Sequence, residues 1–339
     1  MNAELLYAFF TPASRQREVC PLRNSIWSAL LALAVLFALV WLDRLLTERA
    51  PEPPPAPVQS AKPPAEETRL TVLIDGEARE ILLEDYLVGV TAAEMPADFA
   101  PEALKAQAVA ARTYAIYCAR GGKHGEADVC TDPGCCQAWL SDEALRKRWG
   151  GDYDARREKI AAAVDATAGE ILRYEGQAVF AAFHSSSAGF TEDCGAIWNA
   201  LPYLKSVFSP ESAESVPNYV TQVTRSALDF RDTLLYARPA ADLSGAPETW
   251  LGETERDESG RVASLVLGGE RFPGTELRGL FSLRSTAFTL AYADGVFVFT
   301  VTGFGHGVGM SQYGAEVMAE AGSDYRAILA HYYPGTELG

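Results

Sequence analysis

The segment TAAEMPADFAPEALKAQAVAARTYA, residues 91–115, is the best guide to the fold. Its second half predicts a long helix, because Pro101 is favoured at the first helical position and small apolar residues follow it. This helix should run to about Arg120, where the pair Gly121-Gly122 ends it. A shorter helix is expected just before it, over residues 84–93, where apolar residues recur at helical spacing.

Strand-forming segments lie on both sides of this helical centre. Residues 70–75 and 77–83 flank Asp75-Gly76, a strong hairpin signal. A third helix is expected over residues 154–168. The remaining expected elements are strands at 170–173, 179–183, 262–267, 287–292 and 296–301, and two final helices at 311–321 and 325–332. Since strands and helices mix without a regular βαβ rhythm, the sequence predicts an α+β fold, one mixed globular domain over residues 69–339.

An uncharged apolar run, IWSALLALAVLFALVWL, occupies residues 26–42. At about 1.5 Å per residue it is just long enough for a thin bilayer, and Trp27 and Trp41 lie where indoles prefer the headgroup region. A cleaved signal peptide is the alternative, but it requires small residues at a cleavage site, and this run ends in Trp-Leu-Asp-Arg. The sequence therefore favours an uncleaved transmembrane helix.

The flanks of the predicted anchor suggest its orientation. Residues 1–25 carry Arg15, Arg17 and Arg23, against two arginines shortly after the span, so the positive-inside rule leans towards a cytoplasmic tail. Residues 43–68 include PEPPPAPVQSAKPPAEET, which is too rich in proline for a helix or a central strand. We expect this extracytoplasmic linker to hold the globular part away from the membrane.

The charge of the chain excludes one large class of partner. Its formal net charge is −16, with 45 acidic and 29 basic residues, and no basic stripe interrupts the sequence. A phosphate polymer would be repelled, so no nucleic-acid partner is expected. Acidic surfaces are common in soluble domains, and the charge alone therefore selects no substrate.

Three further segments stand out besides residues 91–115: FHSSSAGFTE at 183–192, GFGHGVGMSQYGA at 303–315 and ILAHYYPGT at 328–336. In this order, the four segments resemble the SpoIID/LytB family of sporulation proteins. The resemblance extends from about residue 70 to the C-terminus. It implies a lytic transglycosylase that cleaves the MurNAc–GlcNAc bond of peptidoglycan, preferably in glycan without stem peptides, and leaves 1,6-anhydro-MurNAc ends.

The resemblance makes Glu94 the catalytic acid/base. Its apolar neighbours should partly desolvate the carboxyl and raise its pKa towards the range of a general acid. Glycosidases usually need two carboxylates, whereas a lytic transglycosylase uses the C6 hydroxyl of the muramic residue as its nucleophile and manages with one. By sequence alone, a solvated residue at a helix end is the more common interpretation of such a glutamate, and only the resemblance reverses it. Glu102 fits the first turn of a helix, and Glu192 is a weaker candidate for a second carboxylate.

A glycan groove is the second expectation. Lys105 and Arg112 are seven residues apart and share one face of the long helix, while Gln107 and Tyr114 share a neighbouring face. The complete set of expected substrate-binding residues is Lys105, Gln107, Arg112, Tyr114, His184, Ser185, Ser187, His306 and Gln312. The alternatives are a solvated charged stripe for the helix and simple packing for the residues near the C-terminus.

A metal site is the third expectation. His124, Cys130, Cys135 and Cys136 provide nitrogen and sulfur donors within thirteen residues, enough for a closed tetrahedral zinc site. Some members of the resembled family bind zinc in this loop through two histidines and two cysteines, and here Cys135 stands in place of the second histidine. Such a zinc would be structural, and the chemistry itself needs no cofactor. Disulfides, with Cys118 and Cys194 as partners, are the alternative in an extracytoplasmic domain.

The resemblance also implies a cellular setting. The protein would be a single-pass protein of the cell membrane, with its domain between mother cell and forespore in a spore former. Its expected partners are peptidoglycan strands, a SpoIIP-like amidase and a SpoIIM-like membrane protein. A different class of function remains open, a non-catalytic wall-binding activator of an amidase. A zinc-dependent hydrolase is disfavoured, because the four donors leave the metal no open position.

Overall fold

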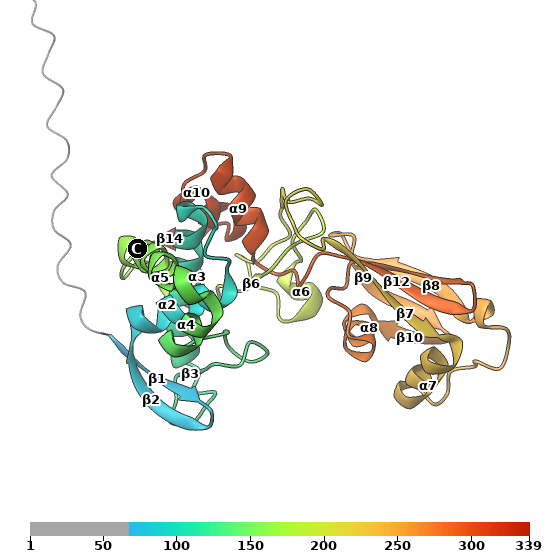
Figure 1. The fold of residues 1–339 in the computed structure, drawn as a ribbon. Coiled ribbons are helices and arrows are strands. Elements are labelled where there is room, and N and C mark those ends of the chain that lie inside the picture. Colours follow the sequence, from blue (N-terminus) through green and yellow to red (C-terminus); the bar gives the residue numbers. More distant parts are fainter. Residues whose placement is uncertain (1–67) are drawn as a thin grey trace, which may run out of the picture. The chain divides into compact units, whose positions relative to one another are not determined.

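The computed structural model describes residues 68–339, all within one compact unit. The predicted cytoplasmic tail, the predicted anchor at 26–42 and the linker up to residue 67 lie outside the described residues. Among the helices that are described, none is both long and apolar enough to span a bilayer. The fold is a mixture of helices and several small sheets, in keeping with the predicted class (Figure 1).

The long helix predicted from residues 91–115 is α3 (Pro101–Ala119), and it lies at the centre of the first hydrophobic core. All of its alanines except Ala119 are fully buried, because small side chains let neighbouring helices approach closely on several sides. The helices that pack against it are α2 (Leu83–Glu94), α5 (Tyr153–Ala166), α9 (Gln312–Glu320) and α10 (Tyr325–Tyr332). Segments from both ends of the domain thus meet on one helix.

The predicted hairpin is confirmed. β1 (Arg69–Ile74) and β2 (Glu77–Leu82) pair antiparallel, and Asp75 and Gly76 between them have φ of 51° and 85°. Both residues therefore adopt the left-handed region that a tight two-residue hairpin requires. The short strand β3 (Val129–Cys130) adds parallel to β1 and ties the cysteine loop to this sheet.

Smaller elements complete the first half. α4 (Asp142–Trp149) begins at Ser141, whose side chain accepts from the Ala144 N–H, and a turn of 3₁₀ helix joins α4 to α5. The predicted strand at 179–183 does not form as one element. Instead β4 (Leu172–Tyr174) and β5 (Gln177–Ala178) make a hairpin whose outer partner is β14 (Glu337–Leu338), and the remaining elements here are β6 (Phe183–His184) and α6 (Cys194–Ile197).

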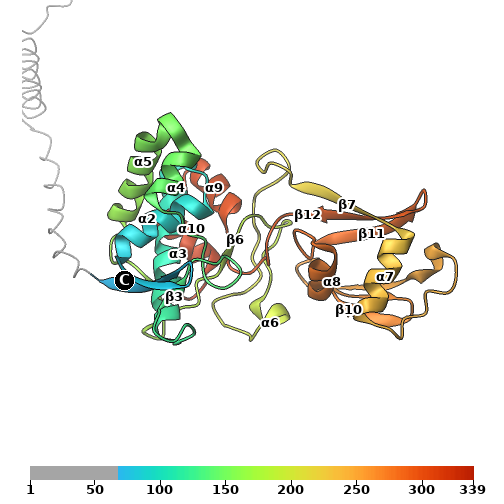
Figure 2. The same ribbon diagram turned by 60° about the horizontal axis from the view of Figure 1, so that its bottom comes forward.

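Two three-stranded sheets enclose a second hydrophobic core, shown in yellow to orange in Figures 1 and 2. One sheet has the order β11-β12-β7 and the other β10-β9-β8. Their bounds are β7 (Val220–Ser226), β8 (Leu251–Arg256), β9 (Val262–Leu267), β10 (Glu270–Pro273), β11 (Phe288–Ala293) and β12 (Val296–Thr302), with helices α7 (Ala227–Ala237) and α8 (Gly274–Phe281) and a short 3₁₀ turn, Pro247–Trp250. Strand alternation buries Phe297 and Phe299 of β12, and the Phe230 ring stacks on Phe297 with centroids 3.8 Å apart.

The chain returns from the second core through the glycine-rich segment that starts at Gly303. There β13 (Met310–Ser311) pairs in parallel with β6, joining the second and third motifs of the sequence. Gly309 makes this approach possible, because its φ is 73° and an added Cβ would lie 2.0 Å from the Ala182 carbonyl oxygen. The fold therefore gathers all four motifs around α3.

Candidate active site

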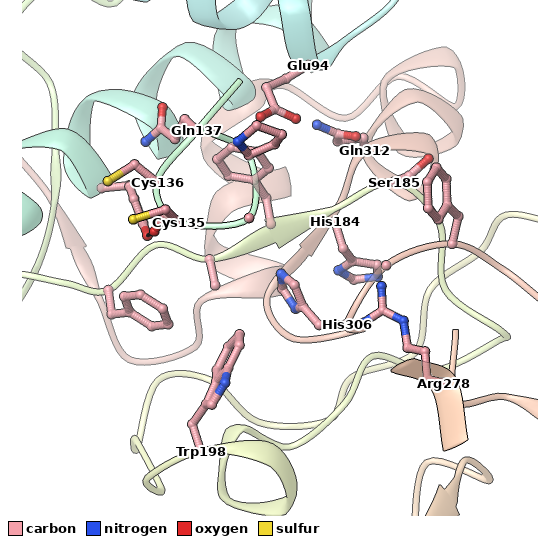
Figure 3. Close-up of a pocket in the computed structure, with 18 of the residues that line it drawn as sticks. Glu94, Cys135, Cys136, Gln137, His184, Ser185, Trp198, Arg278, His306 and Gln312 are labelled. Atoms are coloured by element: carbon pink, nitrogen blue, oxygen red, sulfur yellow. Dashed lines mark hydrogen bonds between the residues drawn. The ribbon is translucent and has the colours of Figure 1, made fainter. Parts of the chain in front are cut away.

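A cavity of about 660 Å³ opens where the four motifs meet (Figure 3). One wall is formed by Glu94 at the end of α2 and by Tyr114 of α3. The wall opposite carries His184 from β6, His306 from the glycine-rich loop and Arg278 from α8. Residues far apart in the sequence thus face one enclosed space, as expected of a binding site.

Glu94 is the last residue of α2, and the sequence after it explains why the helix ends there. Pro96 forces the preceding Met95 out of the helical region, to φ −115° and ψ 147°. The carboxyl of Glu94 then accepts a hydrogen bond from the Ala138 N–H at 2.7 Å. Burial raises the pKa of Glu94 above its ordinary value, and the hydrogen bonds from Ala138 and the Gln312 side chain partly oppose that rise. Such a carboxyl keeps its proton to higher pH than an exposed glutamate.

Among the described residues that line the cavity, Glu94 is the one carboxylate. Glu192, the other candidate, is not a lining residue: it is buried, and its Oε2 lies 3.8 Å from Arg261 Nε and 3.2 Å from Ser259 Oγ. Burial, followed by the charge of Asp257, raises the pKa of Glu192 to about 7. The Glu192 carboxylate contacts Arg261 and Ser259 instead of the cavity.

Two imidazoles lie side by side beneath Glu94, with ring centroids 5.7 Å apart. His184 Nδ1 lies 3.2 Å from the Val308 carbonyl oxygen and must donate to it, so Nε2 accepts from the Ser187 hydroxyl at 2.7 Å. Burial lowers the pKa of His306 to about 4, and it lowers the pKa of His184 as well. Both rings are therefore neutral at neutral pH. Both nitrogens of His184 already have partners within the protein, while His306 Nδ1 accepts from the Val308 N–H.

The predicted groove residues divide into two groups. Tyr114, His184, Ser185, His306 and Gln312 line the cavity. Ser187 does not line it, because its hydroxyl is fully buried behind His184.

Arg112, Lys105 and Gln107 lie elsewhere, contrary to the prediction. Arg112 is fully buried and makes paired hydrogen bonds of 3.0 and 2.6 Å with Glu84, besides contacts with backbone carbonyls. Lys105 pairs with Glu102 at 2.6 Å, and Gln107 is buried with Gln312 Nε2 3.5 Å from its Oε1. The predicted shared face of Lys105 and Arg112 does not face the cavity, because other helices of the bundle pack against α3 there.

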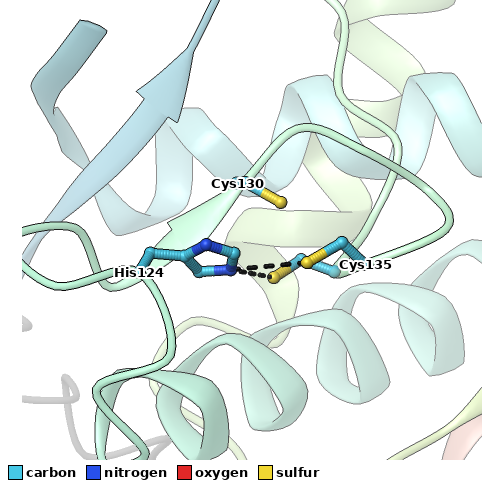
Figure 4. Close-up of side chains that lie close together, drawn as sticks. His124, Cys130 and Cys135 are labelled. Carbon is cyan, nitrogen blue, oxygen red and sulfur yellow. Dashed lines mark hydrogen bonds between the residues drawn. The ribbon is translucent and has the colours of Figure 1, made fainter. Parts of the chain in front are cut away.

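The four predicted metal donors come together in the loop after α3 (Figure 4). His124 Nε2 lies 3.1 Å from Cys136 Sγ and 3.6 Å from Cys135 Sγ, and all four donor atoms, Cys130 Sγ included, lie within 4.8 Å of one another. Zinc–ligand bonds of about 2.0–2.3 Å in a tetrahedron place donor atoms about 3.4–3.8 Å apart. The donor set therefore fits a zinc ion in type, number and spacing. All cysteines in the described part of the chain are free thiols.

Comparison with known proteins assigns the chain to a family. The family model "SpoIID: Stage II sporulation protein" matches residues 76–174. Stage II sporulation protein D of Bacillus amyloliquefaciens is 38% identical over 288 residues, which cover 83% of this chain and 82% of that protein. The chain belongs to the SpoIID family. The Bacillus subtilis protein of the same name is 40% identical over 262 residues, 76% of this chain and 74% of that protein.

One similar protein has a different name. The "Amidase enhancer" of Bacillus subtilis is 31% identical over 305 residues, covering 74% of this chain but 40% of that longer protein. The family of this chain therefore indicates a role in sporulation.

Several cavity residues of the SpoIID-family chain were missed by sequence reasoning. Trp198 is 43% exposed, and its ring centroid lies 5.0 Å from that of His306 and 5.6 Å from that of Phe180. Exposed aromatic faces of this kind suit stacking against sugar rings. Trp198 and Arg278 lie outside the four motifs, so no local pattern in the sequence marked them. An isolated, otherwise unexplained tryptophan was the one available signal.

The cysteine loop of this SpoIID-family chain is also part of the cavity wall. Cys135 and Cys136 line the cavity, and Ala138, two residues further on, holds the Glu94 carboxyl. Lys123 Nζ donates to the Cys135 carbonyl oxygen at 3.1 Å. Because the Ala138 N–H holds the Glu94 carboxyl, the conformation of this loop affects the position of that carboxyl.

Proposed function

We propose that this SpoIID-family protein is a peptidoglycan lytic transglycosylase with Glu94 as its general acid and base. Protonated Glu94 gives its proton to O4 of the departing GlcNAc as the bond to C1 of the muramic residue breaks. The resulting carboxylate then takes the proton of the C6 hydroxyl, whose oxygen attacks C1. The products are a free GlcNAc O4 hydroxyl and a 1,6-anhydro ring, and Glu94 is protonated again with no water consumed.

The observation that carries this proposal is a partly desolvated carboxyl without a second carboxylate among the described residues of the cavity. An inverting hydrolase needs a second carboxylate to activate water, and a retaining hydrolase needs one as its nucleophile. A transglycosylase needs neither, because the substrate carries its own nucleophile. Neutral His306 suits hydrogen bonding to sugar hydroxyls or N-acetyl groups, and Trp198 suits stacking.

The second candidate is a wall-binding activator of an amidase, and the name of the Bacillus subtilis relative favours it. The two functions separate in one experiment. The full-length protein in detergent is incubated with glycan strands freed of stem peptides, and mass spectrometry follows 1,6-anhydro-muramyl ends. The enzyme releases them without any partner, whereas an activator alone releases none.

Glu94→Gln should reduce the release by roughly two to four orders of magnitude, the usual contribution of a general acid. Glu102→Gln is the matched control, because Glu102 lies outside the cavity and pairs with Lys105. Its release rate should equal that of the unmodified protein. Undiminished cleavage by the Glu94→Gln protein would contradict the assignment.

We further propose that His124, Cys130, Cys135 and Cys136 hold one structural zinc ion. The mutual spacing of their donor atoms supports this, and four protein donors leave no open position for substrate. When bound, the ion would hold the loop in place and supply no Lewis acid to the reaction. The ammonium of Lys123 lies beside the cluster and would offset part of the negative charge of three thiolates.

The cellular setting is proposed on the predicted anchor and on the family. The protein would be held in the cell membrane by residues 26–42, with residues 69–339 outside the cytoplasm and, in a spore former, between mother cell and forespore. A SpoIIP-like amidase would prepare its substrate, since the amidase-related name of one relative points to joint action on the wall. A SpoIIM-like membrane protein is the third proposed partner.

A further inference from the structure

Arg278 is a cation of the cavity that the proposed chemistry does not use. It belongs to α8 in the second core, yet it is a lining residue of the cavity beside the first core. Figure 3 shows its guanidinium directed towards His184 and His306, while Glu94 lies on the far side of the two imidazoles. The second core thus contributes a side chain to the proposed active site.

The hydrogen bonds of Arg278 leave most of its guanidinium free. Nε donates to the Leu283 carbonyl oxygen at 3.3 Å, an ordinary contact for an arginine in the last turn of a helix. Within residues 68–339, neither Nη group has a hydrogen-bond partner and Arg278 forms no ion pair. The contact with the helix end involves Nε alone, and no described residue forms a hydrogen bond with the two Nη groups, which face the cavity.

Charge in the cavity differs from charge on the chain. The chain carries −16, but the described lining residues include one carboxylate, Glu94, and two cations, Lys123 and Arg278. Lys123 is exposed and donates to the cysteine loop, so its charge belongs to that cluster. Arg278 is half-buried and has no counter-charge within residues 68–339, so its guanidinium is free to pair with an anion that enters the cavity. A substrate with a negative group would meet an unpaired cation there.

We propose that Arg278 binds the lactyl carboxylate of the muramic residue and thereby selects glycan strands whose stem peptides have been removed. This inference rests on the proposed function. The lactyl group ends in a free carboxylate after an amidase has acted, but it is a neutral amide while the peptide is attached. A guanidinium binds a carboxylate through two parallel charge-assisted hydrogen bonds, which an amide cannot accept in the same way.

The cavity places the proposed carboxylate-binding residue, Arg278, and the proposed acid, Glu94, on two opposite walls. The lactyl ether at C3 and the reacting carbon C1 belong to one sugar ring. In the proposed complex, a muramic residue between the two walls would present its carboxylate to Arg278 and its glycosidic bond to Glu94, two side chains that Figure 3 shows on opposite sides of the imidazoles. The same contact would fix which sugar of the alternating strand occupies the cleavage position.

The test compares two substrates that differ in one group. Glycan strands with free lactyl carboxylates are divided, and one portion is converted to primary amides with a carbodiimide and ammonia. The unmodified full-length protein should cleave the carboxylate strands with a kcat/KM about tenfold to hundredfold higher, the range expected from hydrogen bonds to a charged group. Arg278→Gln should lose that factor on carboxylate strands, keep its rate on amide strands and so show a ratio near one. Arg278→Lys should recover part of the preference.

Arg271→Gln is the matched control, since Arg271 is an exposed arginine of the same core that pairs with Glu255. It should keep the full preference. An unchanged ratio in Arg278→Gln, or no preference in the unmodified protein, would overturn the role of Arg278. If neither strand gives anhydro products, the proposed function fails separately. Calorimetry then compares the affinity of the protein for N-acetylmuramic acid with its affinity for the amide, which tests the role of Arg278 without cleavage. Equal affinities in the unmodified protein would then overturn it.

Discussion

At the scale of single residues, the position of Glu94 follows from its two neighbours in sequence. Met95 is buried and Pro96 cannot continue the helix, so α2 ends at Glu94 with the side chain beside the Ala138 N–H. The carboxyl is thereby held by the backbone of another loop and by Gln312. A helix-end glutamate that looks ordinary in the sequence becomes a partly desolvated acid only through these long-range contacts.

Glu94 should lower the stability of the protein at neutral pH. Burial raises its pKa in the folded state above the ordinary value of 4.5, so the folded state binds the proton more tightly than the unfolded state. Its contribution to stability is therefore largest in acid and is lost as pH rises through the folded pKa. Glu94→Gln removes the ionisation and keeps an oxygen for the Ala138 N–H.

Thermal unfolding of both proteins between pH 4 and pH 8 measures this effect. Glu94→Gln should melt at an equal or higher temperature at pH 8, and any advantage should shrink towards pH 4. Cleavage by the unmodified protein should fall as pH rises through the same pKa, because the general acid loses its proton. If Glu94→Gln melted clearly below the unmodified protein at pH 8 but not at pH 4, the result would contradict a raised pKa of Glu94.

Arg112 and Arg278 show what sequence reasoning can reach at this scale. The seven-residue spacing predicted that Arg112 and Lys105 share one face of α3, but it could not say what each side chain packs against: Arg112 pairs with Glu84 and Lys105 with Glu102. Glu84, which forms an ion pair with the Arg112 guanidinium, belongs to another helix, α2. Arg278 could not be predicted, because its segment carries no motif and its approach to the cavity depends on the tertiary fold.

At the scale of elements, the loop between α3 and α4 joins the proposed metal site to the proposed acid. It begins with His124, passes through Cys130 in β3 and reaches Cys135 and Cys136 just before Ala138. The spacing of these donors was readable from the sequence, and the structure brings all four together. That Ala138 bonds to Glu94 could not be read from the sequence, since the two residues are 44 positions apart.

Removal of the proposed zinc should weaken both stability and cleavage. Cys130→Ala deletes one of the four donors, and a chelator removes the ion, so the loop that positions Glu94 should loosen. The unmodified protein should contain about one equivalent of zinc by elemental analysis. Cys130→Ala should contain well under half an equivalent, with a lower melting temperature and slower cleavage.

Cys194→Ala is the control for a buried cysteine outside the cluster, and it should keep its zinc. Zinc below about a tenth of an equivalent in the unmodified protein, together with an absence of free thiols, would favour disulfides instead. In that outcome, chelators should leave the melting temperature unchanged.

At the scale of the whole molecule, the described residues are organised around two hydrophobic cores. The sequence predicted strands at 262–267, 287–292 and 296–301, and these are confirmed within about one residue as β9, β11 and β12. The division into two cores was not predicted, because alternation within a strand shows that one face is buried but not which other strands share that core. The helices α7 and α8 were missed as well.

The predicted anchor belongs to this scale too, and cell fractionation tests it. The full-length chain should sediment with membranes and resist extraction by high salt, because residues 26–42 are apolar and uncharged. Deletion of residues 1–50 should release the protein into the soluble fraction. Cleavage of the chain within residues 43–68 in cells would contradict an uncleaved transmembrane helix. Release of the full-length chain from membranes by high salt would contradict it as well.

The origin of the oxygen at the new glycan end tests the central claim most directly. The full-length protein cleaves peptide-free glycan in water labelled with oxygen-18, and mass spectrometry examines the muramyl ends. Because the C6 hydroxyl replaces water as the nucleophile, the account predicts 1,6-anhydro ends without label, formed by the unmodified protein and absent with Glu94→Gln. New labelled reducing muramyl ends that accumulate as the strands are cleaved, beyond the label taken up with Glu94→Gln, would show hydrolysis and would contradict the account.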